Sequence, residues 1–217
     1  MNTLIYFILT IGYIGFFIWG LKLSRRNIWT LTNTLLLVII GLIYDNLIIA
    51  VGRFIGEGDL LEGLSYVRYL LHALFTPTLI LFALGICLKL GFPWAKKTFW
   101  KGTFSLITVG LILYELFTSV IGLELKSNEE LGLLTYESVE SAGPLMVIFI
   151  TIVLVIIGIL LAKKFRFYWL LIGTIVMTGG SLVARWIESF PIMNILEFIL
   201  ILSLLLTKRF QVSRNSE

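Results

Sequence analysis

The sequence predicts an all-α, polytopic membrane protein with seven transmembrane helices, and three observations lead to this fold class. The 217-residue chain is 59 % hydrophobic and 14 % charged, and its mean hydropathy is +1.00. These values lie outside the range of ordinary soluble domains. The apolar residues form seven segments of near-bilayer length, and most basic residues lie between alternate segments. Together these observations predict a single transmembrane domain over residues 1–217.

Each apolar segment is bounded by charged residues, glycine or proline, and a hydrocarbon core needs about 20 apolar residues per helix. The predicted helices cover residues 3–23, 29–52, 67–90, 102–123, 143–162, 167–187 and 191–207. The first segment has no basic residue before it and no small-residue cleavage site after it, so we expect a retained span. The longest connection, from Glu124 to Ala142, is acidic and polar and too short for a separate domain.

The basic residues predict how the helices are oriented. Thirteen of the 17 follow the first, third, fifth or seventh segment: Lys22, Arg25, Arg26, Lys89, Lys96, Lys97, Lys101, Lys163, Lys164, Arg166, Lys208, Arg209 and Arg214. By the positive-inside rule, the N-terminus lies outside and the C-terminus in the cytoplasm. This pattern indicates a lipid bilayer as partner and no nucleic acid; the location is the plasma membrane if the protein is bacterial. Twelve of the 13 carboxylates fall on the outer side, which insertion rules do not require.

A weak internal repeat divides the helices after the first into three hairpins. Tyr44-Asp45 and Tyr114-Glu115 each stand near the end of a helix, and the next helix carries Pro77 or Pro144 near its outer start. A looser third copy begins at Arg185. Parallel repeats of this kind are a known way to build small membrane proteins.

Four ionisable groups on four different helices lie at a similar depth. At a rise of about 1.5 Å per residue, Asp45 lies roughly 10 Å below the outer end of its helix, and His72, Glu115 and Glu197 fall in the same layer. Ionisable groups within a bilayer face the bundle interior or a water-filled cavity, so we expect these four to converge as catalytic groups. The residues expected to bind a substrate there are Asn46, Arg68, Tyr69, Tyr114, Arg185 and Asn194. Glu137 and Glu140 are placed to line the mouth of such a cavity.

Structural roles compete with these functional ones. Asp45 and Arg68 would also form an ion pair that locks the second and third helices together. His72 would also serve as an interhelical hydrogen-bonding group, and Asn46 and Asn194 as polar links between helices. A divalent metal is weakly supported, because the chain has one histidine and neither HxxxH nor HExxH spacing. We therefore predict no metal site, and the sequence implies no cofactor.

The alternation of an aromatic-acid pair in one helix with a proline in the next is loosely similar to the small membrane-embedded lycopene and terpene cyclases. In that resemblance, the segment from Pro191 to Phe198, which contains Glu197, corresponds to the segment of the cyclases in which a proline precedes acidic residues. The paired glutamates usual there are replaced by Leu196-Glu197. The resemblance implies acid–base chemistry on an isoprenoid.

Three functions remain open. The first is an enzyme that performs acid–base chemistry on a lipid or isoprenoid, of an isomerase, cyclase or lipid-modifying type. The second is a proton- or cation-coupled transporter of a small solute, and the third is a ligand-binding membrane sensor. A deep cavity that opens sideways to lipid favours the enzyme, whereas a water-filled path towards Lys96-Lys97 favours the transporter.

Overall fold

The computed structural model is mostly helical, and its long apolar helices suit a membrane protein. It describes residues 2–24, 29–130, 132–139, 143–184 and 191–214. Among these, five helical segments are long and apolar enough to cross a bilayer: Asn2–Ser24, Leu31–Ile55, Asp59–Lys89, Thr98–Val120 and Leu145–Phe165. The last two predicted spans are helical, but they fall outside this group. One has 16 residues, and the other carries Glu197, Lys208 and Arg209.

The helices follow one another with short connections. In chain order they are α1 (Asn2–Ser24), α2 (Thr34–Ile55), α3 (Asp59–Phe75), α4 (Leu79–Lys89), α5 (Pro93–Lys96), α6 (Thr98–Glu115), α7 (Leu145–Phe165), α8 (Trp169–Ala184) and α9 (Ile192–Arg214). A 3-10 segment, Leu31–Asn33, precedes α2, and a π-helical turn, Leu116–Val120, extends α6. Another 3-10 segment, Thr76–Thr78, joins α3 to α4 at Pro77, whose missing N–H interrupts the regular α-helical ladder.

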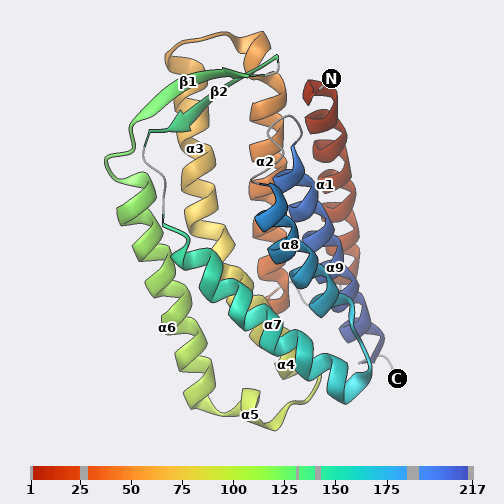
Figure 1. Ribbon diagram of the computed structural model, residues 1–217. Helices are drawn as coiled ribbons and strands as arrows, with labels where there is room; N and C mark the ends of the chain where they lie inside the picture. The colour runs from red at the N-terminus through yellow and green to blue at the C-terminus, as the bar shows by residue number, and fades with distance from the viewer. Residues whose placement is uncertain (1, 25–28, 131, 140–142, 185–190, 215–217) are drawn as a thin grey trace.

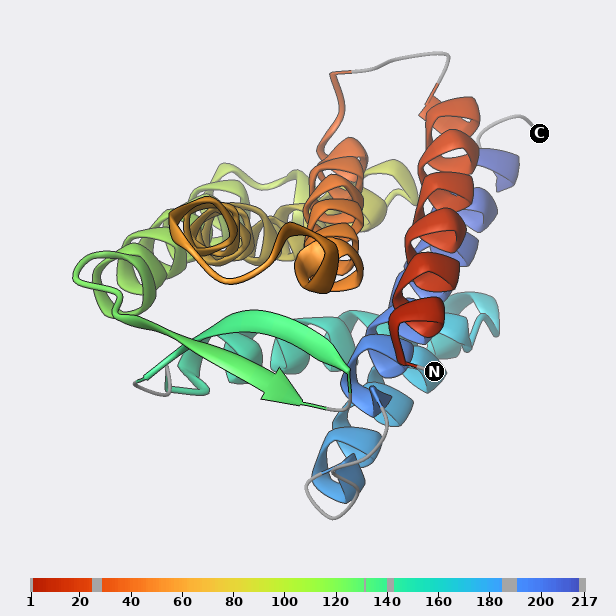
Figure 2. The same cartoon turned by 90° about the horizontal axis from the view of Figure 1, so that it is seen from above.

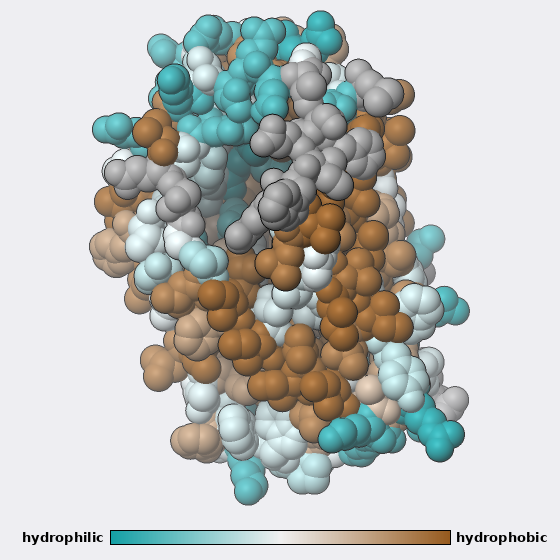
Figure 3. Space-filling model, viewed as in Figure 1, coloured by the Kyte–Doolittle hydropathy of each residue, from teal (hydrophilic) through white to brown (hydrophobic). Residues whose placement is uncertain are grey.

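The helices form an elongated bundle with two chemically different ends (Figure 1). One end carries the α2–α3 connection and a β-hairpin, and we call it the hairpin end. The other carries α5, the α7–α8 connection and the C-terminal part of α9, and we call it the basic end. Figure 3 shows hydrophobic residues across the middle of one face and hydrophilic residues at both ends. A hydrophobic band between polar ends is the pattern that a bilayer requires.

The structure is mostly helical, and the all-α prediction missed a β-hairpin in the connection between α6 and α7. Strands β1 (Leu125–Glu130) and β2 (Leu133–Ser138) pair antiparallel, with Leu125 opposite Ser138 and Glu130 opposite Leu133. Gly132, with φ +78°, lies in the turn between them. β2 begins with two leucines and ends with two polar residues, so it lacks the strict alternation that signals a half-buried strand in a sequence.

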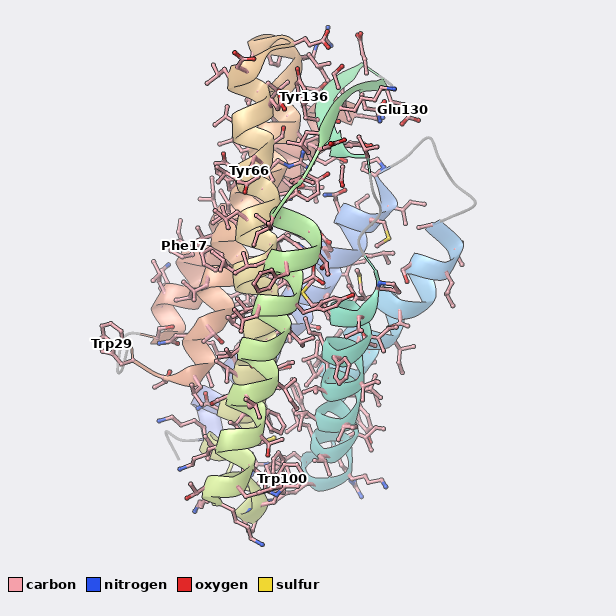
Figure 4. The ribbon with its side chains drawn as sticks, turned by 90° about the vertical axis from the view of Figure 1, so that its left-hand side faces the viewer. Phe17, Trp29, Tyr66, Trp100, Glu130 and Tyr136 are labelled. Carbon is pink, nitrogen blue, oxygen red and sulfur yellow. The ribbon has the colours of Figure 1, made fainter. Side chains whose placement is uncertain are left out.

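Two tyrosine hydroxyls and a buried ring attach the hairpin to the helices. The N–H of Gly58 donates to the Tyr136 hydroxyl at 3.1 Å, and the N–H of Ser138 donates to the Tyr69 hydroxyl at 2.9 Å. The ring of Tyr136 belongs to a small buried cluster with Ile48 of α2 and Leu61 of α3. Figure 4 shows Tyr136 beside the N-terminal end of α3. Figure 2 shows the hairpin lying across the top of the bundle.

The largest extensions beyond the predicted limits occur in α3 and α9. α3 begins at Asp59 rather than at residue 67, because its first turn carries Asp59 and Glu62, which stabilise a helix N-terminus, and buries Leu61. α9 continues to Arg214 rather than ending at residue 207. Residues 185–187, the predicted end of the sixth helix, lie outside the described part of the chain.

The extension of α9 places Lys208 inside a helix rather than after it. Its side chain is only 1 % exposed. The ammonium Nζ donates to Ser24 Oγ and to Asn33 Oδ1, each at 2.6 Å. These neutral oxygens come from the end of α1 and from the segment before α2, so Lys208 ties three elements together at the basic end.

The main hydrophobic core occupies the basic half of the bundle and surrounds α4. Every residue of α4 from Leu79 to Cys87 except Leu81 is buried. A helix that is apolar on all sides belongs in the interior of a bundle. α4 continues α3 towards the basic end, so the core closes the bundle directly beneath the polar residues of α3.

We expect Gly52→Ala to displace the hairpin, because a Cβ at this position of α2 would collide with the carbonyl oxygen of Leu134. The overpacking should lower the free energy of unfolding by about 1–3 kcal/mol. Thermal unfolding in detergent measures the change. The matched control is Gly63→Ala in α3, where a Cβ meets nothing within 4 Å, and there alanine should stabilise the helix by about 0.5–1 kcal/mol. Equal melting temperatures for the Gly52 variant and the unmodified chain would contradict the close approach.

Candidate functional site

A cavity of about 250 Å³ lies between α2, α3 and α9, on the hairpin side of the main core. We call it the inner cavity. Its polar lining consists of Asp45 from α2, Arg68, Tyr69 and His72 from α3, Thr76 from the joint with α4, and Asn194 and Glu197 from α9. Its apolar lining consists of Val38, Gly41, Leu42, Leu71 and Phe75. One cavity thus holds three of the predicted catalytic groups, Asp45, His72 and Glu197, and three of the predicted binding residues.

A second cavity of about 200 Å³ lies nearer the hairpin, and we call it the outer cavity. Its lining consists of Asn2, Tyr6, Ile49, Arg68, Asn128, Glu130, Leu133, Thr135, Glu137 and Pro191. Arg68 lines both cavities and therefore stands at the boundary between them. Beneath the hairpin, Figure 3 shows hydrophilic groups at the bottom of a hollow in this face of the molecule.

An ion pair joins the two helices that form one wall of the inner cavity. Arg68 Nε donates to Asp45 Oδ1 at 2.7 Å, and the two side chains are 13 % and 26 % exposed. The ion pair expected between the second and third helices is therefore present. One residue before Asp45, the Tyr44 hydroxyl donates to the Leu64 carbonyl of α3 at 3.1 Å. These two contacts hold α2 against α3 at the depth of the cavity.

His72 lies one helical turn after Arg68 and faces the same cavity. Its Nδ1 is 3.3 Å from the Thr76 hydroxyl, one further turn along the chain. The side chain is exposed even though it lies midway along the bundle, because it borders the cavity. Among the described residues Nε2 has no hydrogen-bond partner, so the described contacts contain no interhelical bond to this histidine.

α9 supplies the opposite wall through two residues on one face. Asn194 accepts a hydrogen bond from the Tyr6 hydroxyl of α1 at 3.2 Å, which fixes the start of α9 against α1. Glu197 follows three residues later and lines the same cavity. In the described part of the chain, the Glu197 carboxyl makes no hydrogen bond and no ion pair. It is therefore a half-buried acid with no fixed partner among the described residues.

Several predicted site residues lie elsewhere. Glu115 of α6 is buried, 4 % exposed, and accepts a hydrogen bond from the Ser119 hydroxyl at 2.9 Å; it lines neither cavity. Asn46 is fully buried, lines neither cavity and donates to the Leu42 carbonyl at 2.9 Å. The Tyr114 hydroxyl stands near Gly143, at the α6–α7 connection. Arg185 and Glu140 lie outside the described residues.

The hairpin and α1 add residues that the sequence did not point to. Asn128 and Thr135 line the outer cavity beside the predicted Glu137, because the hairpin folds back over the bundle. Tyr6 lines the outer cavity and reaches Asn194. A signal for Tyr6 was present in the sequence, since Tyr6 and Tyr13 are seven residues apart and share one face of an otherwise apolar helix.

No group of three histidine, cysteine, aspartate or glutamate side chains able to hold a metal ion occurs among the described residues. Compared with known proteins, the chain matches no protein-family model and no curated protein. The similarity to the cyclases therefore gains no support from relatives, and the function has to be inferred from the cavities themselves.

The interaction free energy between Asp45 and Arg68 should be measurable in a double-mutant cycle. We expect Asp45→Asn and Arg68→Gln each to lower the free energy of unfolding, because each leaves an uncompensated charge or an unpaired donor in the bundle. The double variant should be more stable than the sum of the single losses predicts, by about 0.5–3 kcal/mol. Denaturant unfolding in detergent measures the cycle.

The control for this cycle pairs Asp45→Asn with Arg53→Gln, an exposed arginine two turns further along α2. Distant sites should combine additively to within about 0.5 kcal/mol. Additive losses in both cycles would contradict a direct interaction between Asp45 and Arg68.

Proposed function

We propose that this chain is an integral membrane enzyme that performs acid–base chemistry on the polar end of a lipid or isoprenoid held in the inner cavity. The observation that carries this proposal is the composition of the cavity wall. His72 of α3, Glu197 of α9 and the Asp45–Arg68 ion pair line one cavity together with five apolar residues, and the Glu197 carboxyl has no partner among the described residues. Convergent ionisable groups inside an apolar bundle are typical of a functional site.

We also propose that α8 and α9 cross the membrane together with the five long apolar segments, which gives seven spans. Figure 1 shows α8 and α9 running along the bundle beside α7 and α1. The concentration of lysine and arginine at the basic end supports a cytoplasmic location for that end. The cavities then lie in the outer half of the bilayer.

His72 and Glu197 are the proposed proton-transfer pair. When Nδ1 of His72 donates to the Thr76 hydroxyl, Nε2 carries the free lone pair and acts as a base. Glu197, on the opposite wall, then donates a proton in its acid form. One group supplies a proton while the other removes one, so the substrate is rearranged without any change in oxidation state.

The proposed task of the Asp45–Arg68 pair is to position the substrate. Its charges largely compensate each other, and the remaining guanidinium N–H groups point towards polar atoms of a bound molecule rather than taking up protons. The apolar residues Val38, Leu71 and Phe75 keep one side of the cavity free of water, which strengthens electrostatic interactions inside it.

The size and surroundings of the inner cavity favour chemistry at a lipid end over transport. At about 250 Å³ the cavity lies just below the usual size range of small-molecule pockets, about 300–1,000 Å³, so it suits the end of a lipid better than an entire one. Towards the basic end the chain continues into α4, whose residues from Leu79 to Cys87 are apolar and, except for Leu81, buried. A solute moving to the cytoplasm would have to pass this core.

The experiment that tests the proposal compares the lipids of cells that carry the gene with those of cells that lack it. We expect the deletion to change a lipid or isoprenoid pool, and the unmodified gene to restore it. His72→Ala and Glu197→Gln should reduce restoration at least 100-fold, the usual size of an acid–base contribution. Membrane abundance of each variant has to be measured in parallel.

The matched control is Glu62→Gln, which neutralises an exposed carboxyl in the first turn of α3 and should restore the pool fully. If His72→Ala and Glu197→Gln both restore the pool as well as this control does, the inner cavity is not an active site.

A further inference from the structure

The guanidinium of Arg68 has more donors than the surrounding protein satisfies. Its Nε donates to Asp45, whereas Nη1 is enclosed and has no acceptor among the described residues. The remaining nitrogen, Nη2, is neither enclosed nor hydrogen-bonded within the described part of the chain. Because Arg68 lines both cavities and Nη2 is not enclosed, a molecule in the inner cavity is in a position to offer an acceptor to Nη2. An arginine has five N–H donors and no acceptor, so the missing partner is an oxygen with a lone pair.

The charges around Arg68 disfavour a negatively charged oxygen. Asp45 already neutralises the guanidinium at 2.7 Å. Glu197 borders the inner cavity, and Glu130 and Glu137 border the outer one. Apart from Arg68, the described lining of the two cavities includes no lysine or arginine. A phosphate or carboxylate would therefore lie close to the carboxylates of Asp45, Glu130 and Glu137, and the arginine beside it is already paired with Asp45.

A positively charged head group fits no better. The carboxylates would attract an ammonium group, but an ammonium group has only donors and would face the donors of Arg68. An uncharged hydroxyl meets both requirements, because its oxygen accepts from Arg68 while its hydrogen is donated to a carboxylate such as Asp45, which lines the same cavity. The apolar side of the cavity, with Val38, Leu42 and Phe75, suits the first carbons of an attached chain.

We propose that the inner cavity binds an uncharged lipid alcohol, with its hydroxyl at Arg68 and its chain along the apolar wall. This inference rests on the proposed function only in taking the inner cavity as the lipid site. It adds the chemical class of the head group, and it is tested by binding rather than by turnover.

The test uses the purified full chain in lipid nanodiscs and three photoreactive probes with the same 15-carbon isoprenoid chain. One ends in a primary alcohol, one in a phosphate monoester and one in a primary amine. We expect the alcohol to label peptides of α2, α3 or α9 at a concentration at least tenfold below that needed for the other two, and excess unlabelled alcohol to compete with it.

Two variants locate the contact. The double variant Asp45→Asn with Arg68→Gln keeps the net charge of the pair, and it should weaken labelling by the alcohol at least tenfold. Arg53→Gln removes an exposed arginine at the hairpin end and should leave labelling unchanged. Thermal unfolding of each variant confirms that it is folded.

The outcomes separate this inference from the proposed function. Stronger labelling by the phosphate or by the amine would overturn the head-group assignment and leave a lipid site in place. Equal labelling of the double variant and the unmodified chain would also overturn it, because Arg68 would then not hold the hydroxyl. Failure of all three probes to label the cavity saturably would overturn both the lipid alcohol and the lipid site.

Discussion

The ion pair between Asp45 and Arg68 is the constraint on which the polar half of this bundle depends. Neither charge is tolerated alone between apolar helices, so α2 and α3 have to present them to each other. Their pairing fixes the rotation of both helices about their axes. His72 and Thr76 follow Arg68 at intervals of one turn, and the same rotation therefore carries them to the inner cavity.

The structure shows which parts of this arrangement a sequence can predict. Most helix positions follow from hydropathy, and the face shared by Arg68, His72 and Thr76 follows from their spacing. Convergence of side chains from distant helices cannot be predicted in this way, because hydropathy gives the depth of a residue in the bilayer but not the direction in which its side chain points. Asn46 and Glu115 stand at the expected depth, yet neither lines a cavity, and both form hydrogen bonds to residues four positions away in the chain.

The β-hairpin and the C-terminal extension of α9 could not be predicted from the sequence for another reason. Both depend on contacts with elements far away in the chain. β2 is stable as a strand because the ring of Tyr136 is buried against α2 and α3, and α9 continues because Lys208 finds neutral oxygens near α1 and α2. Local composition, acidic in one case and basic in the other, indicated solvent exposure and gave no sign of either partner.

Tyr69 connects the β-hairpin to the inner cavity. The side chain lines the inner cavity, and its hydroxyl accepts the N–H of Ser138 at the end of β2. A tyrosine ring turns about only two side-chain bonds, so it cannot swing out of the cavity and still hold that strand. Tyr69 thus couples the inner cavity to β2: a molecule that displaces the ring also breaks the hydrogen bond between its hydroxyl and the N–H of Ser138.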